Sequence, residues 1–384
     1  MGYPAFWVRD AVMMLGGKLI SQQELKGWIL LIAAAVQGPK AWNVRPGVVV
    51  PPYTVPDHID LNGKPSFYPG SYATGSKQGG YPYGKYPPLD DNFWFLKTVY
   101  EYWVMTRRIA FFHSRVKTSF GKMRLDDLCE HVYSAAPADP ATGLVTAGNI
   151  KRENAKDWGF CDGEFKSGKL LFPSILKYIA ARQLAQLFRA AGEKKKSDRY
   201  KRGAEQIRKS IPGVFFHKTR QTGEGWLNSA TGIGNQPDVW GSAFAVWSGA
   251  VEGRTADAIS HALVRAFRDK TAVRDGCVRQ ILTTDPTNHG GWQCSIVKPG
   301  TYQNGGYWGV PVGWYITAIK RVNHPAAVEL AQAYIEFLKD NRRPNGMAEA
   351  WEWFNPETGK HNNPLYVATV ALPYLSLREA GLLK

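Results

Sequence analysis

Apolar residues recur at intervals of three and four along eleven segments of the chain, the spacing that gathers them on one face of an α-helix. In the second segment, for example, Leu25, Trp28, Ile29, Ile32 and Ala33 follow this spacing. The segments predicted as helices are 6–20, 22–37, 90–112, 121–135, 172–191, 197–210, 239–250, 255–269, 310–322, 325–341 and 365–382. They come in pairs with a short connection inside each pair, and no core segment is predicted as a strand. Helical hairpins in this number predict an all-α closed ring or solenoid.

Long loops rich in Gly, Pro and aromatic residues separate the helix pairs. If the start of the chain is counted as the first loop, the second to sixth loops lie at 38–89, 137–171, 211–237, 275–309 and around 347–359. Loops on one face of such a ring converge on its mouth, and loops commonly carry function. Eleven helices are one fewer than six pairs require. Because the cluster Trp7, Arg9 and Asp10 stands almost at the start, we expect an N-terminal truncation, with the first helix of the fold missing.

The net charge of +16 and the pI near 9.6 change this picture little. The basic run around Lys194, Lys195 and Lys196 is interpreted as a solvated helix end, and no nucleic-acid motif or phosphate-binding Gly loop accompanies it. No stretch reaches the ~18 apolar residues of a membrane span. We therefore expect no nucleic-acid or membrane partner, and a single catalytic domain over 1–384. The charge leaves a mild preference for an acidic polysaccharide.

Metal and cofactor chemistry find no support in the sequence. Cys129, Cys161, Cys277 and Cys294 lack zinc-like spacing and are expected to be buried free thiols. No Gly-x-Ser-x-Gly elbow and no pair of histidines at i, i+4 occurs. We expect neither a metal nor a cofactor.

Each long loop instead combines carboxylates with aromatic rings. The last loop holds Glu349, Trp351, Glu352 and Trp353 just before Asn355. Aromatic rings lie against the apolar faces of a sugar, and carboxylates bind its hydroxyls or activate water, so this pattern predicts carbohydrate recognition. Taken singly, Asp90 and Asp238 also suit helix N-caps. The residues expected to bind sugar are Trp7, Arg9, Asp10, Asp91, Trp158, Trp240, Asn304, Tyr307, Trp308, Glu349, Trp351 and Trp353.

Five segments in this order carry a family resemblance: YPAFWVRD at 3–10, WGFCDG at 158–163, GKLLFPSIL at 168–176, YQNGGYW at 302–308 and EWFNPETG at 352–359. The chain resembles the six-hairpin, (α/α)6-toroid glycoside hydrolases. Within them it is most similar to the clan of trehalase, the processing α-glucosidases and the glycogen-debranching glucosidases. The resemblance implies an (α/α)6 toroid whose long loops share one face.

The resemblance also implies roles for particular residues. Asp10 falls where the clan binds the sugar at the cleavage subsite, Asp162 matches the general acid, and Glu352 matches the general base. The residues around Asp162 depart from the closest members, so Asp157 and Glu164 stay open as the acid, and Glu349 as the base. Glycoside cleavage needs such a pair, and in inverting enzymes the two carboxyl groups stand ~6.5–9.5 Å apart around a water.

The sequence thus predicts a glycoside hydrolase, exo-acting and inverting, with a carbohydrate substrate. One alternative is an unsaturated-uronyl hydrolase or a polysaccharide lyase on an acidic glycan. Another is a toroid that binds carbohydrate without catalysis. The sequence does not distinguish a cytoplasmic from a secreted or periplasmic protein.

Overall fold

The computed structural model describes residues 5–15, 19–69, 85–148, 163–219, 222–342, 345–347, 349–362 and 364–383. It divides into two compact units. The N-terminal unit comprises the described residues of Pro4–Asp162 and Ser167–Ser210, and the C-terminal unit those of Gly163–Lys166 and Ile211–Lys384. Each is described by itself.

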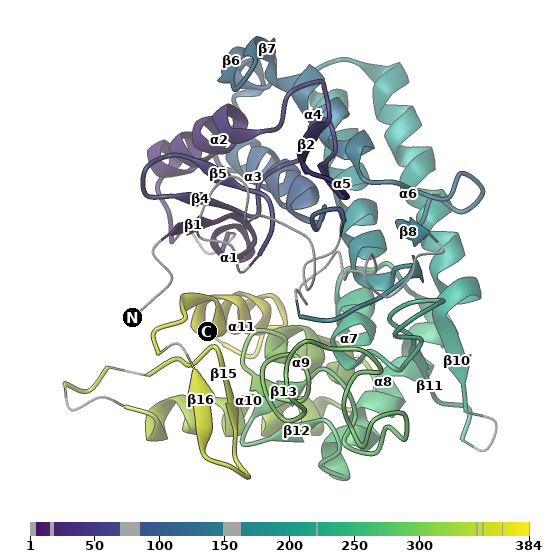
Figure 1. Cartoon of the computed structure of the whole chain (residues 1–384). Helices are drawn as coiled ribbons and strands as arrows, with labels where there is room; N and C mark the ends of the chain where they lie inside the picture. The colour runs from purple at the N-terminus through teal and green to yellow at the C-terminus, as the bar shows by residue number, and fades with distance from the viewer. Residues whose placement is uncertain are drawn as a thin grey trace. The chain divides into compact units, whose positions relative to one another are not determined.

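The N-terminal unit is built on helices α1 to α6 (Figure 1). Their bounds are α1 Val8–Met13, α2 Gln22–Ala35, α3 Asp91–Thr106, α4 Leu125–Ala135, α5 Leu171–Ala190 and α6 Lys194–Phe215, the last continuing beyond Ser210. Helix α3 packs against α1, α2, α4 and α5 and buries most of its first three turns. Helix α2 begins with a capping box in which Ser21 and Glu24 bond each other's backbone amides.

The C-terminal unit contains α7 Val239–Trp247, α8 Gly253–Arg268, α9 Val312–Lys320, α10 His324–Asp340 and α11 Val367–Glu379. Helix α9 contacts α7, α8, α10 and α11. A Cβ at Gly313 of α9 would lie 2.3 Å from the Cβ of Ser376, so the glycine lets α9 and α11 approach closely. Helices α7 and α9 are apolar nearly throughout, whereas α8 is amphipathic, as expected for inner and outer members of hairpins.

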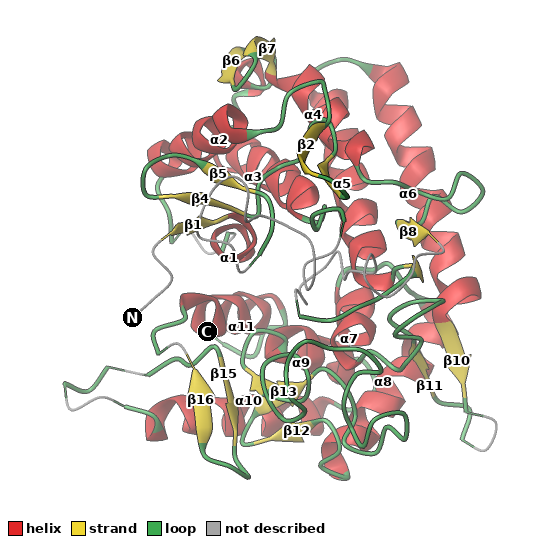
Figure 2. Cartoon of the chain, viewed as in Figure 1, coloured by secondary structure: helices red, strands yellow, loops and turns green. Residues whose placement is uncertain are grey.

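Short antiparallel strands lie in the connections between helices (Figure 2). The C-terminal unit has a five-stranded sheet of order β12-β13-β14-β15-β16, with strands Val273–Arg274, Cys277–Arg279, Tyr307–Trp308, Trp353–Asn355 and Lys360–Asn362, and a hairpin of β10 Phe216–Lys218 and β11 Gly225–Leu227. The N-terminal unit has a sheet of β1 Ala5–Trp7, β4 His58–Asp60 and β5 Pro65–Ser66, and the pairs β2 Trp42–Arg45 with β3 Val48–Val50, β6 Arg115–Thr118 with β7 Gly121–Arg124, and β8 Thr146–Gly148 with β9 Gly168–Lys169.

The predicted all-α hairpin architecture is confirmed, with corrected helix ends. The helix predicted over 6–20 begins only at Val8, because residues 5–7 pair with β4 instead. The helix predicted over 121–135 begins at Leu125, because residues 121–124 form β7 of a hairpin. The helix predicted to run to residue 112 ends at Thr106, where Arg107 adopts a left-handed conformation, and a short 3-10 turn, η1 Ile109–Phe111, follows.

Cys129, Cys277 and Cys294 are buried free thiols, as predicted, while Cys161 lies outside the described residues. Among the described residues, no helix combines the length and apolarity that crossing a bilayer requires.

Candidate functional site

A buried guanidinium surrounded by carboxylates forms the polar centre of the N-terminal unit. Arg9, near the start of α1, donates two hydrogen bonds to Asp90, from Nε at 2.7 Å and from Nη2 at 3.0 Å. Its Nη2 also lies 3.7 Å from Asp91 and 3.9 Å from Asp57. Burial alone would lower the pKa of Arg9, but the negative charges of Asp90, Asp91 and Asp57 outweigh it and raise that pKa well above its ordinary value.

Asp91 differs from Asp90 in that neither of its carboxylate oxygens accepts a hydrogen bond from the described residues, although its side chain is fully buried. Burial, and then the neighbouring charge of Asp90, raise the pKa of Asp91 well above its ordinary value, with Arg9 opposing the shift. The negative charges of Asp57 and Asp10 act in the same direction as that of Asp90. The cluster therefore contains a carboxyl group biased towards its protonated form.

An imidazole and an indole ring border this cluster. His58 is fully buried, with Nδ1 2.8 Å from Asp57 Oδ2, and the ring of Trp7 stacks on it at 4.1 Å between centroids. The pairing of β1 with β4 places Trp7 opposite His58 and so brings the start of the chain to the second long loop. Four residues predicted from sequence to bind sugar, Trp7, Arg9, Asp10 and Asp91, thus gather in one unit.

The two predicted N-caps have different outcomes. Asp238 caps α7, since its Oδ1 accepts from the backbone N–H of Gly241 at 2.8 Å. Asp90 makes no capping bond. Its carboxylate accepts hydrogen bonds from Arg9 and from the indole N–H of Trp94, the latter at 3.2 Å. The expected cap is therefore wrong for Asp90, whose side chain pairs with Arg9 instead.

In the C-terminal unit, the five-stranded sheet brings the fifth and sixth loops together. Tyr307 of β14 pairs with both Arg279 of β13 and Phe354 of β15. Glu352, one residue before β15, is 3% exposed, and its backbone N–H donates to the carbonyl of Asn362 at 3.1 Å. The predicted base is therefore buried and held beside a sheet.

Several of the predicted sugar-binding residues are packed inside this unit. Trp240 and Trp308 meet edge to face at 5.5 Å, and each indole N–H donates to a backbone carbonyl. The side chain of Asn304 accepts a hydrogen bond from the backbone N–H of Trp292 at 2.7 Å and donates one to the backbone carbonyl of Val297 at 2.8 Å. With Tyr307, these side chains are at most 2% exposed, and their contacts stabilise the loops of the fifth connection.

The sixth loop turns its two tryptophans to different surroundings. A bend at Glu352 breaks the strand alternation. Trp353 lies against Gly306, whereas Trp351 stacks on His361 at 4.2 Å and meets Phe337 of α10 edge to face at 6.1 Å. Trp351 lines a hollow of about 560 Å³ together with Asp275, Ala333, Glu336, Phe337, Asp340, Asn341, Phe354, Asn355, Pro356, Gly359 and Lys360.

The remaining predicted residues are placed only in part. Asp162, Trp158 and the alternative acid Asp157 lie outside the described residues. Glu164, the other alternative acid, is buried in the C-terminal unit and accepts from the Ser295 hydroxyl at 3.0 Å. Glu349, the alternative base, is half-buried, and its N–H donates to the carbonyl of Asn341.

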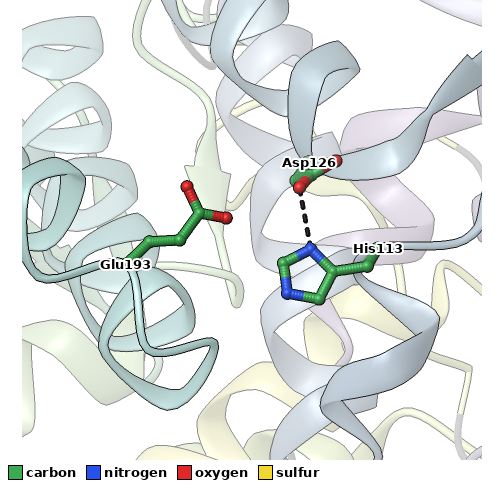
Figure 3. A group of neighbouring side chains, drawn as sticks. All are labelled: His113, Asp126 and Glu193. Carbon is green, nitrogen blue, oxygen red and sulfur yellow. Dashed lines mark hydrogen bonds and ion pairs between the residues drawn. The ribbon is translucent and has the colours of Figure 1, made fainter.

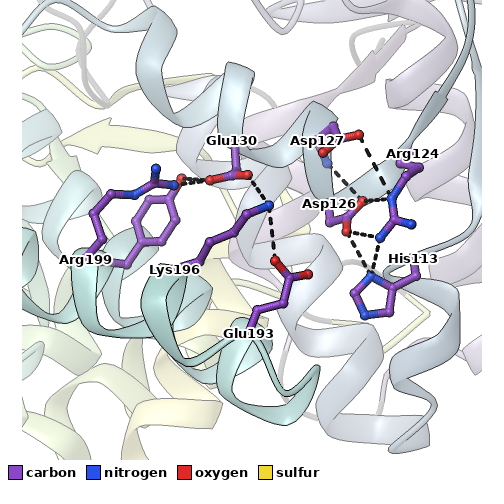
Figure 4. A network of polar contacts seen from close by, with 9 residues as sticks. His113, Arg124, Asp126, Asp127, Glu130, Glu193, Lys196 and Arg199 are labelled. Atoms are coloured by element: carbon purple, nitrogen blue, oxygen red, sulfur yellow. Dashed lines mark hydrogen bonds and ion pairs between the residues drawn. The ribbon is translucent and has the colours of Figure 1, made fainter.

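A group with the composition of a metal site lies elsewhere in the N-terminal unit. One ligand atom each from His113, Asp126 and Glu193 falls within 4.8 Å of the others (Figure 3). Positive side chains of the protein itself already bind its carboxylates: Arg124 lies 2.6 Å from Asp126, and Lys196 lies 3.2 Å from Glu193 (Figure 4). We interpret it as part of an ion-pair network that ties α4 to the start of α6.

Two arginine environments were missed by reasoning from sequence. Arg9 was predicted to bind sugar, but its hydrogen bonds to Asp90 were not predicted. The two residues are 81 positions apart, and a sequence does not indicate which carboxylate an arginine meets at such a separation. Arg279 was not singled out. It lies buried beside Tyr307 and carries no motif; the one available signal is a basic residue in the mostly apolar stretch 277–282 of a predicted loop.

No protein-family model matches the sequence, and no curated protein matches it either. Solved structures do match. A mannosylglycerate hydrolase from Thermus thermophilus superposes with a TM-score of 0.54 at 13% identity, covering 98% of this chain and 94% of its own. A bacterial glucoamylase in complex with acarbose gives 0.58 at 14% identity, covering 97% of this chain and 48% of its own. A rhamnosidase of Bacillus sp. GL1 gives 0.54 at 14% identity, covering 98% of this chain and 32% of its own.

This chain therefore spans about a third of that rhamnosidase and about half of the glucoamylase, but nearly all of the mannosylglycerate hydrolase. These structures are six-hairpin glycosidase folds. At such identities the likeness concerns the fold, which is that of the (α/α)6-toroid glycosidases.

Proposed function

We propose that this chain is a glycoside hydrolase forming a single catalytic domain over residues 1–384, exo-acting and inverting, with a carbohydrate substrate and no cofactor. The observation that carries the proposal is the likeness, over 97–98% of the chain, to a glucoamylase, a mannosylglycerate hydrolase and a rhamnosidase. Clustered carboxylates and indole rings in both units support it, because this is the chemistry that sugar recognition requires.

Asp162 is the proposed general acid and Glu352 the proposed general base. In the inverting mechanism the acid protonates the leaving oxygen, and the base removes a proton from the water that attacks the anomeric carbon. The burial of Glu352 beside β15 supports its role, since a base held by a sheet keeps its position during the reaction. Asp10, half-buried beside the Arg9 cluster, is the proposed ligand of the sugar hydroxyls at the cleavage subsite.

The other proposed sugar-binding residues divide by accessibility. Trp7, Glu349 and Trp351 are half-buried and keep surface for contact with a sugar. The buried residues of this set would act indirectly, by holding in place the loops that bear the site. They are Arg9, Asp91, Trp240, Asn304, Tyr307, Trp308 and Trp353. Trp158 completes the proposed set.

The test is hydrolysis by the full chain and by its Asp162→Asn and Glu352→Gln variants. The substrates are an aryl rhamnoside, mannosylglycerate and a maltooligosaccharide, the classes named by the similar structures. General acid–base catalysis contributes about 10²- to 10⁴-fold, so each variant is expected to lose at least 100-fold in kcat on whichever substrate is cleaved. Proton NMR of the first-formed anomer is expected to show inversion.

Glu349→Gln, Glu164→Gln and Asp157→Asn are the matched controls, because each neutralises a rival carboxylate. They are expected to keep kcat within a few-fold of the unmodified protein. A larger loss in a control than in Asp162→Asn or Glu352→Gln would move the role to that rival. Release of the anomer with retained configuration would overturn the inverting mechanism. Binding of sugar without turnover would overturn the proposal that the protein is an enzyme.

A further inference from the structure

The side chain of Arg279 is a buried cation with no carboxylate partner among the described residues. It is 9% exposed. Its Nη2 donates to the backbone carbonyl of Gly290, and its guanidinium lies 5.8 Å from the ring centroid of Tyr307. Its Nε–H is fully buried and has no hydrogen-bond partner in the described chain. Arginine keeps its charge inside proteins, so the described residues leave a full positive charge buried here without a counter-ion.

Glycines make the space that this guanidinium occupies. A Cβ on Gly305 would lie 2.5 Å from Nη2 of Arg279, and one on Gly290 would lie 3.3 Å from it. Both glycines have positive φ, +107° and +81°, which other residues rarely adopt. Arg279 thus lies in a slot formed by loop backbone rather than by packed apolar side chains.

The slot lies within the fifth loop and next to the sixth. Arg279 and Tyr307 are register partners across β13 and β14, and Tyr307 pairs in turn with Phe354 of β15. Gly305, beside the guanidinium, follows Asn304 directly. The side-chain amide of Asn355, three residues after Glu352, donates to the backbone carbonyl of Gly300. Gly300 also lies close to Gly305, since a Cβ on Gly305 would be 3.2 Å from the backbone nitrogen of Gly300. The unpaired charge is therefore adjacent to loops that carry proposed substrate-binding residues.

A buried charge without a partner is costly unless something neutralises it, and the planar fork of arginine matches a carboxylate. Backbone groups, an aromatic ring and glycines surround the guanidinium, so nothing in the described chain supplies the anion. We propose that Arg279 binds the carboxylate of an acidic sugar substrate, such as a uronic acid unit. This inference rests on the proposed function, because it takes the bound sugar to be the substrate, and it names the class of that substrate.

Calorimetric binding of D-glucuronate, its neutral methyl ester and D-glucose to the full-length protein tests the proposal at constant ionic strength. A charge-assisted hydrogen bond to a buried group predicts that D-glucuronate binds about 10- to 100-fold more tightly than the other two. Arg279→Met is expected to reduce this preference to less than about threefold. Arg274→Met, which removes the same charge from half-buried β12 of the same sheet, is the matched control and is expected to leave it unchanged.

Two further variants separate recognition from folding. Arg279→Lys keeps the charge without the fork, and an affinity between those of the unmodified protein and Arg279→Met is expected. Gly305→Ala places a methyl group where the guanidinium lies, and loss of the preference for D-glucuronate is expected in folded protein. Unfolding curves of each variant establish that it is folded before binding is measured.

Equal affinities for D-glucuronate and its methyl ester in the unmodified protein would overturn the proposal. So would an Arg279→Met variant that keeps the preference. Glu352→Gln separates a failure of this proposal from a failure of the proposed function. The variant is expected to bind D-glucuronate like the unmodified protein while losing hydrolysis. If hydrolysis survives in Glu352→Gln while Arg279→Met loses its preference, the proposed base fails and the carboxylate site stands.

Discussion

The two units each bury an arginine, to nearly the same extent and with opposite surroundings. Arg9 is 7% exposed and has three carboxylates within 4 Å, two of its N–H groups bonding Asp90. Arg279 is 9% exposed, and within the described part of the chain it has one carbonyl and one aromatic ring. Burial alone therefore says little about the role of a charged residue, whereas its partners decide it.

The Arg9 cluster carries more negative than positive charge, which is why one of its carboxyl groups, Asp91, has its pKa raised further than burial alone would raise it. The positive charge of Arg9 is compensated within the chain, so the first consequence of the cluster is the positioning of α1 against α3. The described surroundings of Arg279 leave one positive charge uncompensated, so its first consequence is an affinity for an anion. Substitutions in the two regions should separate these consequences.

The largest effect is expected for Arg9→Met. Removing one partner of a buried ion pair leaves uncompensated charge, here on Asp90 and Asp57, and typically costs about 3–5 kcal/mol in the free energy of unfolding. Arg279→Met loses one hydrogen bond and a ring contact but also removes a costly unpaired charge, so a net change of less than about 1 kcal/mol is expected. Guanidinium chloride unfolding of both variants measures the difference, and equal costs would remove the distinction drawn between the two arginines.

A smaller effect, with a characteristic pH dependence, is expected for Asp91→Asn. Below pH 3.8, the ordinary pKa of the group, its carboxyl is protonated in both the folded and unfolded chains. As pH rises above this value, the unfolded chain loses the proton while the folded chain, with its raised pKa, keeps it, so this group lowers stability with increasing pH. Asparagine does not titrate, and the variant should therefore gain stability relative to the unmodified protein between about pH 4 and pH 7.

Asp126→Asn is the control of opposite sign. Burial tends to raise the pKa of Asp126, but hydrogen bonds from Arg124 and His113 outweigh it, so the net shift is downward. Its stabilising contribution is present above pH 3.8 and is lost as pH falls through the lower, folded-state pKa. The Asp126→Asn variant should thus be less stable than the unmodified protein at about pH 7. The same direction of change in both variants would contradict the assigned shifts.

The smallest effect is expected at the helix cap. Asp238→Ala removes the bond to the N–H of Gly241 and should cost about 1 kcal/mol, while Asp238→Ser, which keeps a capping oxygen, should restore most of it. Asp90→Ser should give no such recovery relative to Asp90→Ala, because a serine cannot bind Arg9 through two oxygens as Asp90 does. Thermal unfolding of the four variants compares the two aspartates, and equal behaviour would show that Asp90 also acts as a cap.

Much of the fold was predictable because helical periodicity is local. The three- and four-residue spacing of apolar positions located the eleven α-helices of the described chain, and the alternation of short and long connections predicted the hairpins. Two helix starts were missed where strand pairing competes with helix formation, once locally before α4 and once over a long range before α1. The residues Ala5–Trp7 belong to a strand only because His58–Asp60 is available to pair with them.

The candidate site divides in the same way. Residue types in the loops indicated carbohydrate chemistry, and the start of the chain did meet the second loop, with Trp7 on His58 and Arg9 on Asp90. Other expectations depended on side-chain direction. Trp351 and Trp353 were both expected to bind sugar, and the bend at Glu352 places them beside different neighbours, which the residue types alone do not indicate.

The helical hairpins and the classes of residue in each loop follow from the sequence, because both depend on neighbours within a few positions. Which charges meet depends instead on the complete fold. Arg9 finds Asp90 at a separation of 81 residues, and Arg279 finds a backbone slot instead of a carboxylate among the described residues. The free energy of a buried charge depends on groups brought near by the whole fold, and no local pattern records them.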